Sequence, residues 1–225
     1  KIPSEVWETQ NLSWLDLNKF LPESSSHDPS AFFEWVKYRC HLFRGVVFGT
    51  MLSNEALHFM EFGTYLERAD NTARILKAKY RFSEDQKQHH VNQHSLLKVE
   101  GKTDTFDFYH WVSLLRSVSA FEIFRQTYSD QITPERVVEL LVFNPQLPRS
   151  LTKCLDHLLQ LITLLKNNKS KESERLIGKL KSEFDYSTID DIYKEGLDQF
   201  IQRFLEKINH IADEFSSNFL IPLSA

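Results

Sequence analysis

The chain is poor in the residues that interrupt helices. Its 225 residues include only 6 glycines and 7 prolines, and β-branched runs are few. Leu, Lys, Glu and Phe are frequent, and the 18 phenylalanines point to a core built on aromatic packing. This composition argues against a sheet-rich protein and predicts an all-α fold. With 41% hydrophobic residues, the chain is long enough to bury a sizeable core.

Other features are also missing. The formal net charge is −4, which excludes the basic footprint of a nucleic-acid-binding protein. No apolar run reaches the length of a membrane span, and we expect a cytoplasmic protein without a signal peptide. Cys40 and Cys154 are far apart and form no CxxC motif, which predicts two reduced, buried thiols. Because the chain opens with Lys1-Ile2-Pro3 and has no initiator Met, we expect a fragment or a processed chain.

Hydrophobic spacing and cap residues predict seven or eight helices. The clearest start is Thr133-Pro134-Glu135, where Thr is the N-cap and Pro takes the first helical position. The polar, aperiodic segment Ser83–Asp104 is expected to be a long loop. Short linkers favour antiparallel neighbours, so residues 1–225 are predicted to form a single antiparallel helical bundle. The expected helices cover residues 3–20, 30–51, 53–82, 105–128, 134–143, 149–165, 170–184 and 188–216.

The helix expected at 53–82 has a clear apolar stripe, on which Phe62, Ala69 and Leu76 face the core. Glu67, Asn71 and Arg74 lie on roughly the opposite side. They are either a solvated ladder of polar side chains or, because Gly63 shares their side, residues enclosed by another helix.

The helix expected at 105–128 is apolar on nearly all sides, which is typical of a buried helix. Arg116 and Glu122 interrupt this apolar surface. An isolated buried ion costs several kcal/mol or more, so both charges are expected to be paired.

Several charged residues therefore occur in apolar surroundings. One interpretation is an internal salt-bridge network that fixes the register of the helices. The other is a cleft with surplus guanidinium groups that receives a carboxylate or phosphate. For catalysis, Glu67 or Glu122 would be the general base. The candidate ligand-binding residues are Arg44, Arg68, Arg74, Arg116 and Arg149.

No motif in the sequence requires a metal or a cofactor. There is no His-x-x-Glu-His motif, no Gly-rich phosphate loop and no Gly-x-Ser-x-Gly elbow. We therefore predict neither metal nor cofactor. Cys154 and His157 are three residues apart, and we favour a buried thiol beside a surface histidine over a nucleophilic pair.

Five phrases in this order resemble the bacterial alpha-E domain family. The phrases are specific in combination and order, and the most informative is Phe62-Gly63-Thr64-Tyr65-Leu66-Glu67-Arg68-Ala69-Asp70-Asn71-Thr72-Ala73-Arg74. The resemblance covers nearly the whole chain and implies an all-helical fold. The other phrases are Glu5-Val6-Trp7-Glu8, Phe43-Arg44-Gly45, Leu114-Leu115-Arg116-Ser117-Val118-Ser119-Ala120-Phe121-Glu122, and Thr133-Pro134-Glu135-Arg136-Val137-Val138-Glu139-Leu140-Leu141 followed by Leu147-Pro148-Arg149-Ser150.

The resemblance also implies partners. Members of the family look like companions of ATP-grasp ligase-like proteins and of transglutaminase-like peptidases, which implies a role in making or modifying a peptide or amide bond. Family members usually carry a second Leu-Glu-Arg-Ala-like phrase in a preceding helical stretch, which is not found in this sequence. Three functions follow as expectations: a module that binds a peptide or small anion for an ATP-grasp partner, an enzyme in its own right, or a helical scaffold. A homo-oligomer is compatible with each.

Overall fold

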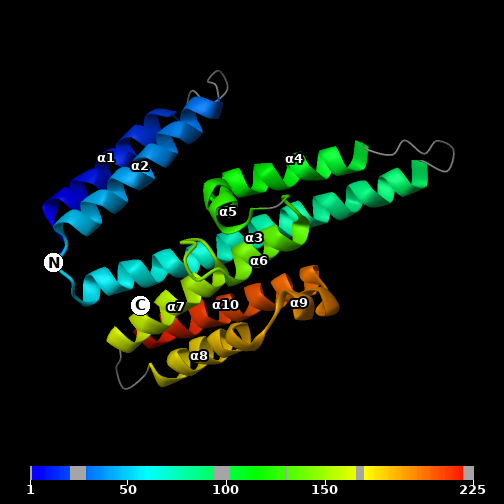
Figure 1. Cartoon of the computed structure of the whole chain (residues 1–225). Coiled ribbons are helices and arrows are strands. Elements are labelled where there is room, and N and C mark those ends of the chain that lie inside the picture. The colour runs from blue at the N-terminus through cyan, green and yellow to red at the C-terminus, as the bar shows by residue number, and fades with distance from the viewer. Residues whose placement is uncertain (1, 21–28, 94–101, 130, 166–169, 220–225) are drawn as a thin grey trace. The chain divides into compact units, whose positions relative to one another are not determined.

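The computed structural model is all-helical and describes residues 2–20, 29–93, 102–129, 131–165 and 170–219 (Figure 1). The prediction of an all-α fold is confirmed. The helices in these ranges are α1 (Ser4–Phe20), α2 (Pro29–Thr50), α3 (Glu55–Gln93), α4 (Lys102–Ser117), α5 (Phe121–Thr127), α6 (Pro134–Phe143), α7 (Leu151–Leu164), α8 (Lys171–Tyr186), α9 (Ile189–Glu195) and α10 (Leu197–Phe219).

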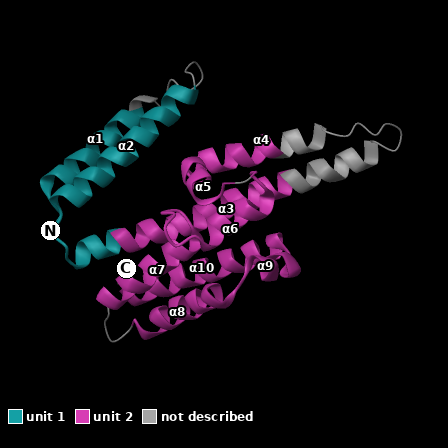
Figure 2. Cartoon of the chain, viewed as in Figure 1, with its two compact units in different colours: residues 1–60 teal, residues 61–225 magenta. Residues whose placement is uncertain are grey.

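The chain divides into two compact units, residues 1–60 and residues 61–225 (Figure 2). Helix α3 begins in the smaller unit and continues in the larger one. The prediction that residues 1–225 form one domain stays a prediction.

The smaller unit is a hairpin of α1 and α2 followed by the start of α3. Its core is small: Val6, Val47 and Leu57 are buried, and Phe43 and Met60 pack against them. Arg39 of α2 forms an ion pair with Asp16 of α1. Two helices enclose little apolar surface, so much of this unit stays accessible to solvent.

The larger unit buries the apolar stripe predicted for α3. Phe62 is fully buried and stacks on Phe215 of α10 with ring centroids 3.9 Å apart. Ala69 and Leu76 are also buried, so the predicted core face is confirmed. Further along α3, Arg81 makes a bidentate ion pair with Asp198 of α10, with N···O distances of 2.7 and 2.8 Å.

Helix α7 packs between its neighbours α6 and α8, and α8 also packs against α10. The predicted start of α6 is confirmed, because the Thr133 side chain accepts a hydrogen bond from the Arg136 amide with Pro134 at the first position. The buried faces of α6 and α7 carry aliphatic side chains, among which Val138, Leu141 and Leu155 are completely buried.

The helix predicted over residues 105–128 is in fact two helices, α4 and α5. Ser119 has φ +56°, and its amide donates to the Arg116 carbonyl at 3.1 Å while the Ala120 amide donates to the Leu115 carbonyl at 2.8 Å. This pair of bonds is a Schellman motif, which usually places Gly at the left-handed position. Because serine occupies this position, the sequence did not indicate that a helix ends there.

The helix predicted over residues 188–216 is also divided. Gly196, with φ +98°, separates α9 from α10. Only glycine adopts this conformation without strain, so its position marks the break. Thr188 and Asp191 form a capping box at the start of α9.

The loop predicted over Ser83–Asp104 is wrong at both ends. Helix α3 continues to Gln93 and α4 begins at Lys102, while residues 94–101 lie outside the described ranges. Residues 83–93 contain no Gly or Pro and several helix-forming Glu, Gln and Lys residues. Their lack of apolar periodicity led to the wrong prediction, because intrinsic propensity can extend a helix that has already formed.

Candidate functional site

The residues that carry the Leu-Glu-Arg-Ala phrase lie where α3 passes α7. The turn before α7 is held by local hydrogen bonds: the Asn144 side chain accepts from the amides of Gln146 and Leu147, at 2.8 and 2.9 Å. Ser150 then caps α7 by accepting from the Lys153 amide at 3.1 Å. The turn is therefore a defined structure that α3 can contact.

An aromatic stack joins the two helices. The ring of Tyr65 on α3 lies parallel to the imidazole of His157 on α7, with centroids 4.1 Å apart and an interplanar angle of 9°. The Arg68 guanidinium carbon lies 4.9 Å from the centroid of the Tyr65 ring, in a cation–π contact. Arg68 Nη1 also donates a hydrogen bond of 3.2 Å to the Pro148 carbonyl in the turn before α7.

Arg68 differs in its partners from three ion-paired arginines of the larger unit. Arg74 pairs with Asp70, Arg81 with Asp198 and Arg175 with Glu172. No carboxylate within the described ranges forms an ion pair with Arg68, whose contacts are the ring and the hydroxyl of Tyr65 and a backbone carbonyl. A guanidinium has five N–H donors in a planar fork, so this half-buried cation retains donors for an anion.

Burial dominates the ionisation of the side chains around Arg68. Burial raises the pKa of the Cys154 thiol to about 12, although Arg68 and Arg149 act in the opposite direction. Burial likewise raises the pKa of the Tyr65 hydroxyl, which Arg68 acts to lower. The thiol is therefore protonated near neutral pH, which leaves it a poor nucleophile.

His157 also favours its neutral form. Its pKa is lowered first by burial and then by the charge of Lys153, with a smaller contribution from Arg68, while Asp156 acts to raise it. A neutral imidazole adds no further positive charge to the site near pH 7. The permanent cations here are Arg68, Arg149 and Lys153.

Thr72 lies one turn after Arg68 on α3. It is buried, and its hydroxyl has no hydrogen-bond partner within the described part of the chain. Glu61, one turn before Tyr65, acts to raise the Tyr65 pKa, so a carboxylate also lies in this region.

Glu67 and Arg74 lie away from this cluster. Both are exposed, Arg74 pairs with Asp70 at 2.6 Å, and Glu67 acts on Arg74 only electrostatically. A Cβ placed on Gly63 would contact nothing within 4 Å. The interpretation of this side of α3 as a solvated face is therefore supported. The residue that pairs with Arg74 is Asp70, whereas the sequence predicted Asn71.

The predicted burial of the charges around 105–128 is wrong. Arg116 and Glu122 are exposed, and neither forms an ion pair with another described residue. The Schellman turn explains the difference, because it ends α4 and lets Arg116 lie over the Phe121 ring at 5.2 Å. Arg44 is half-buried in the smaller unit. Cys40 is exposed and Cys154 is buried, so the prediction for the two thiols is half correct.

The structure brings Arg68 and Arg149 to the surroundings of one buried thiol. Sequence reasoning missed Tyr65, His157 and the Pro148 carbonyl as their neighbours. The spacing of Tyr65 and Arg68 is a cation–π signal on a helix. Nothing in the sequence indicates that His157 lies across from Tyr65, since this depends on how α3 and α7 pack.

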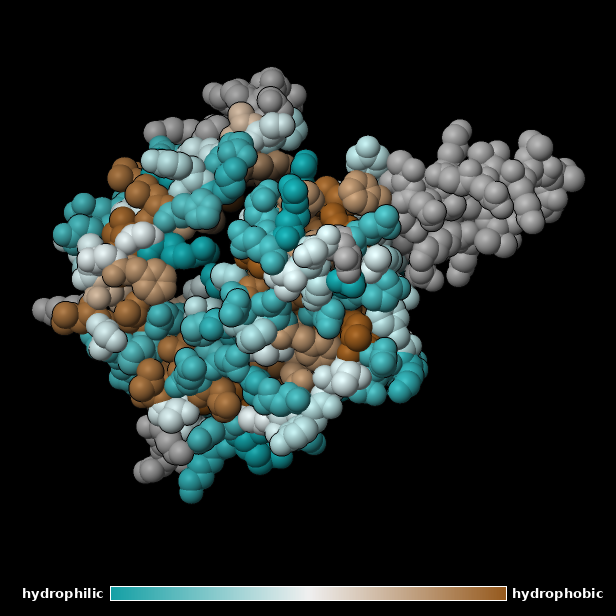
Figure 3. Space-filling model, viewed as in Figure 1, coloured by the Kyte–Doolittle hydropathy of each residue, from teal (hydrophilic) through white to brown (hydrophobic). Residues whose placement is uncertain are grey.

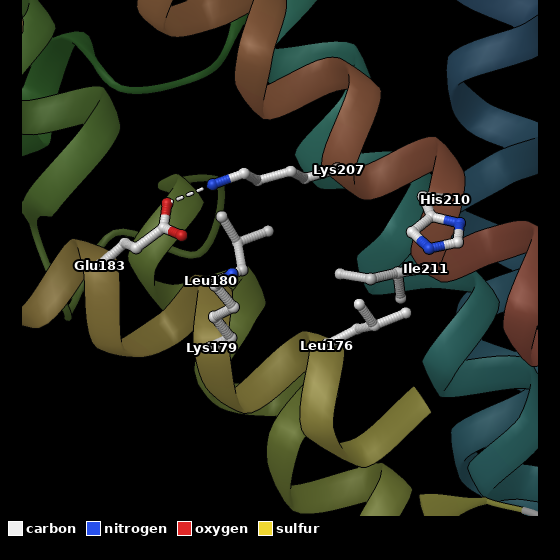
Figure 4. Close-up of a pocket in the computed structure, with 7 residues that line it drawn as sticks. All are labelled: Leu176, Lys179, Leu180, Glu183, Lys207, His210 and Ile211. Atoms are coloured by element: carbon white, nitrogen blue, oxygen red, sulfur yellow. Dashed lines mark hydrogen bonds and ion pairs between the residues drawn. The ribbon is translucent and has the colours of Figure 1, made fainter. Parts of the chain in front are cut away.

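A second concave region lies between α8 and α10 (Figure 4). Its floor is apolar, with Leu176, Leu180 and Ile211, and its edge carries the ion pair between Glu183 and Lys207. The volume of about 200 Å³ is below the range of about 300–1,000 Å³ typical of small-molecule sites. Because Glu183 is also bound by Arg203 at 3.0 Å, its charge is already compensated.

Two searches of the described residues bear on the class of protein. No group of three or more His, Cys, Asp or Glu residues among them is arranged to hold a metal ion. None of their helices combines the length and the apolar character that crossing a bilayer requires.

These features define an all-helical domain with a Glu-Arg pair on one long helix, in which Glu67 is exposed to solvent and Arg68 contacts the turn before α7. The chain belongs to the Alpha-E family, described as a predicted alpha-helical domain with a conserved ER motif, which matches residues 1–220. The Glu67-Arg68 pair is the only Glu-Arg dipeptide of the long motif phrase. Comparisons with curated proteins and with solved structures found no match.

Proposed function

We propose that this chain is a binding module that holds an anionic group, a carboxylate or a phosphate, at Arg68. The observation that carries the proposal is the environment of this guanidinium: it is half-buried, oriented by Tyr65 and the Pro148 carbonyl, and has no carboxylate partner among the described residues. An oriented guanidinium binds carboxylates and phosphates bidentately.

The surrounding charges support an anion as the ligand. Arg149 and Lys153 add positive charge near Arg68, as their effects on Cys154 and His157 indicate. Two carboxylates oppose this charge: Asp156, which acts on His157 but is bound by Lys181 at 3.2 Å, and Glu61, which acts on Tyr65. Catalysis by Cys154 is disfavoured because its thiol is protonated, and the exposed Glu67 and Glu122 lack the burial that would favour a general base.

Titration with two probes tests the anion site. Tri-alanine offers a peptide carboxylate, and inorganic phosphate offers the alternative anion. Calorimetry should show saturable binding of at least one probe by the native chain. Arg68→Gln should weaken it about 10-fold or more, because a hydrogen bond to a charged group contributes ~1.5–3 kcal/mol. Arg68→Lys should recover only part, since the ammonium lacks the planar fork.

Arg175→Gln is the matched control, because Arg175 is exposed and paired with Glu172. It should bind the probe as the native chain does. Circular dichroism of each variant checks that the helices are retained. Absence of saturable binding by the native chain, or equal binding by Arg68→Gln, would show the proposal to be wrong.

We propose further that the module serves an ATP-grasp ligase-like or transglutaminase-like partner by presenting a peptide carboxylate. The companions that the family resemblance implies, together with the affinity of a guanidinium for carboxylates, support this role. A partner that consumes ATP would place the chain in the cytoplasm. The test combines the chain with the ATP-grasp protein of a neighbouring gene and measures the ATP-dependent products by mass spectrometry. The native chain should increase product, whereas Arg68→Gln should not.

A helical scaffold is the second candidate function. It is favoured by the ion pairs between helices of the larger unit: Glu183 of α8 binds both Arg203 and Lys207 of α10. Lys181 of α8 likewise binds Asp156 of α7. A scaffold would bind the partner equally well with Arg68→Gln, which separates this function from the first.

A further inference from the structure

The charge around Arg68 is set by close neighbours. On the face of the molecule shown in Figure 3, hydrophilic and hydrophobic residues are interspersed and do not gather into one large polar patch. Histidine is the side chain whose charge ordinarily changes between pH 5 and pH 8, and His157 is the histidine of this region. Burial raises the pKa values of the Cys154 thiol and the Tyr65 hydroxyl, so both stay neutral in this range. The protonation of His157 therefore decides whether the site gains a further positive charge.

Tyr65 joins His157 to Arg68. The half-buried imidazole lies parallel to the Tyr65 ring with centroids 4.1 Å apart, and the guanidinium carbon lies 4.9 Å from the centroid of the same ring. These two distances place the imidazole centroid at most 9.0 Å from the guanidinium carbon. After burial and Lys153, Arg68 also acts to lower the His157 pKa. The two cationic groups are therefore close enough to repel each other when His157 is protonated.

Other charged groups lie near His157 on each helix that packs against α7. On α7 itself, Lys153 acts to lower the His157 pKa and Asp156 acts to raise it. Lys181 of α8 binds Asp156 at 3.2 Å. A charge on His157 is thus opposed by Lys153 and Arg68 and partly balanced by Asp156. The remaining charged groups with described contacts are Glu61 of α3, which acts on Tyr65, and Arg136 and Glu139 of α6, which contact Tyr128.

A bound anion would change this balance. A carboxylate at Arg68 compensates the guanidinium charge, so a proton on His157 meets less repulsion across the Tyr65 ring. Thermodynamic linkage makes the effect reciprocal: the proton strengthens anion binding by the same factor as the anion strengthens proton binding. Charges several ångströms apart near a protein surface change a binding constant by about 3- to 10-fold.

We propose that protonation of the His157 imidazole strengthens the binding of an anionic group at Arg68, so that the site holds its ligand more tightly at pH 5 than at pH 8. This inference rests on the anion site proposed at Arg68 and adds a means of regulating it. The imidazolium acts through its charge, and Tyr65 holds it beside the guanidinium.

Calorimetric titration of the full chain with N-acetyl-tri-alanine at pH 8 and at pH 5 tests the proposal. This peptide has no free amine, and a terminal carboxylate with an ordinary pKa of about 3.3–3.7 stays ionised at both pH values. The native chain should bind it about 3- to 10-fold more tightly at pH 5. His157→Gln should match the native chain at pH 8 and show no gain at pH 5. His157→Phe, which keeps an aromatic ring against Tyr65, should also show no gain.

His210→Gln is the matched control, because His210 is an exposed histidine of α10, and this variant should keep the gain at pH 5. NMR titration of the His157 ring gives the reciprocal measurement, in which saturating peptide should raise its pKa by the logarithm of the same factor. Equal binding by the native chain at both pH values would overturn the inference and leave the anion site standing. Absence of binding at both would overturn the two together. A gain that persists in His157→Gln and His157→Phe would assign it to another group and overturn the inference.

Discussion

The two cysteines differ in both accessibility and ionisation. Cys40 is exposed on α2, whereas Cys154 is buried on α7 with a pKa near 12. A thiol reagent must reach the sulfur atom and reacts with its deprotonated form, the thiolate. At neutral pH Cys154 is both inaccessible and protonated.

We therefore expect Ellman's reagent to modify one thiol in the folded chain and two after unfolding in denaturant. In Cys40→Ser, modification of the folded chain should fall to almost none. Rapid reaction of Cys154 in folded Cys40→Ser would contradict the burial described for α7.

His157 makes stability depend on pH. Its folded-state pKa lies below the unfolded value of about 6.5, because burial disfavours the charged imidazole. The unfolded chain therefore binds more protons as the pH falls through that value. The contribution to stability is complete above about pH 6.5 and is lost as the pH decreases.

We expect the free energy of unfolding of the native chain to fall more steeply than that of His157→Gln between about pH 8 and pH 5. Urea titrations at each pH measure the difference. NMR titration of the His157 ring should report an apparent pKa below the unfolded value. A value at or above it would contradict the prediction.

At the scale of elements, two backbone conformations decide where helices end. Ser119 completes a Schellman motif after α4, and Gly196 separates α9 from α10. Only the second has the residue type that sequence reasoning associates with a break.

Replacement of Gly196 by Ala should reduce the free energy of unfolding by about 1–3 kcal/mol, because φ +98° is strained for any residue with a Cβ. Gly178 lies within α8, where a Cβ would meet nothing within 4 Å. Gly178→Ala should instead stabilise by about 0.5–1 kcal/mol. Denaturant unfolding of both variants gives the comparison, and equal effects would contradict it.

At the scale of the whole molecule, the sequence predicted the helical class, the core stripe of α3 and the start of α6. These depend on local periodicity and capping, which the sequence carries directly. It did not predict that Arg116 and Glu122 would be exposed, because the apolar surroundings on the helical wheel did not reveal the turn at Ser119. The contact between Arg68 and the Pro148 carbonyl joins residues 80 positions apart, and one sequence does not specify such a contact.

The ion pairs between helices of the larger unit have one more consequence. Those joining α3 to α10 and α8 to α10 lie at the surface, where mobile ions shorten the range of charge to about 8 Å at physiological ionic strength. Such pairs favour one alignment of the helices over neighbouring alignments without contributing much to the free energy of folding. Concentrated salt would therefore leave the unit folded while making sliding of one helix along another less costly.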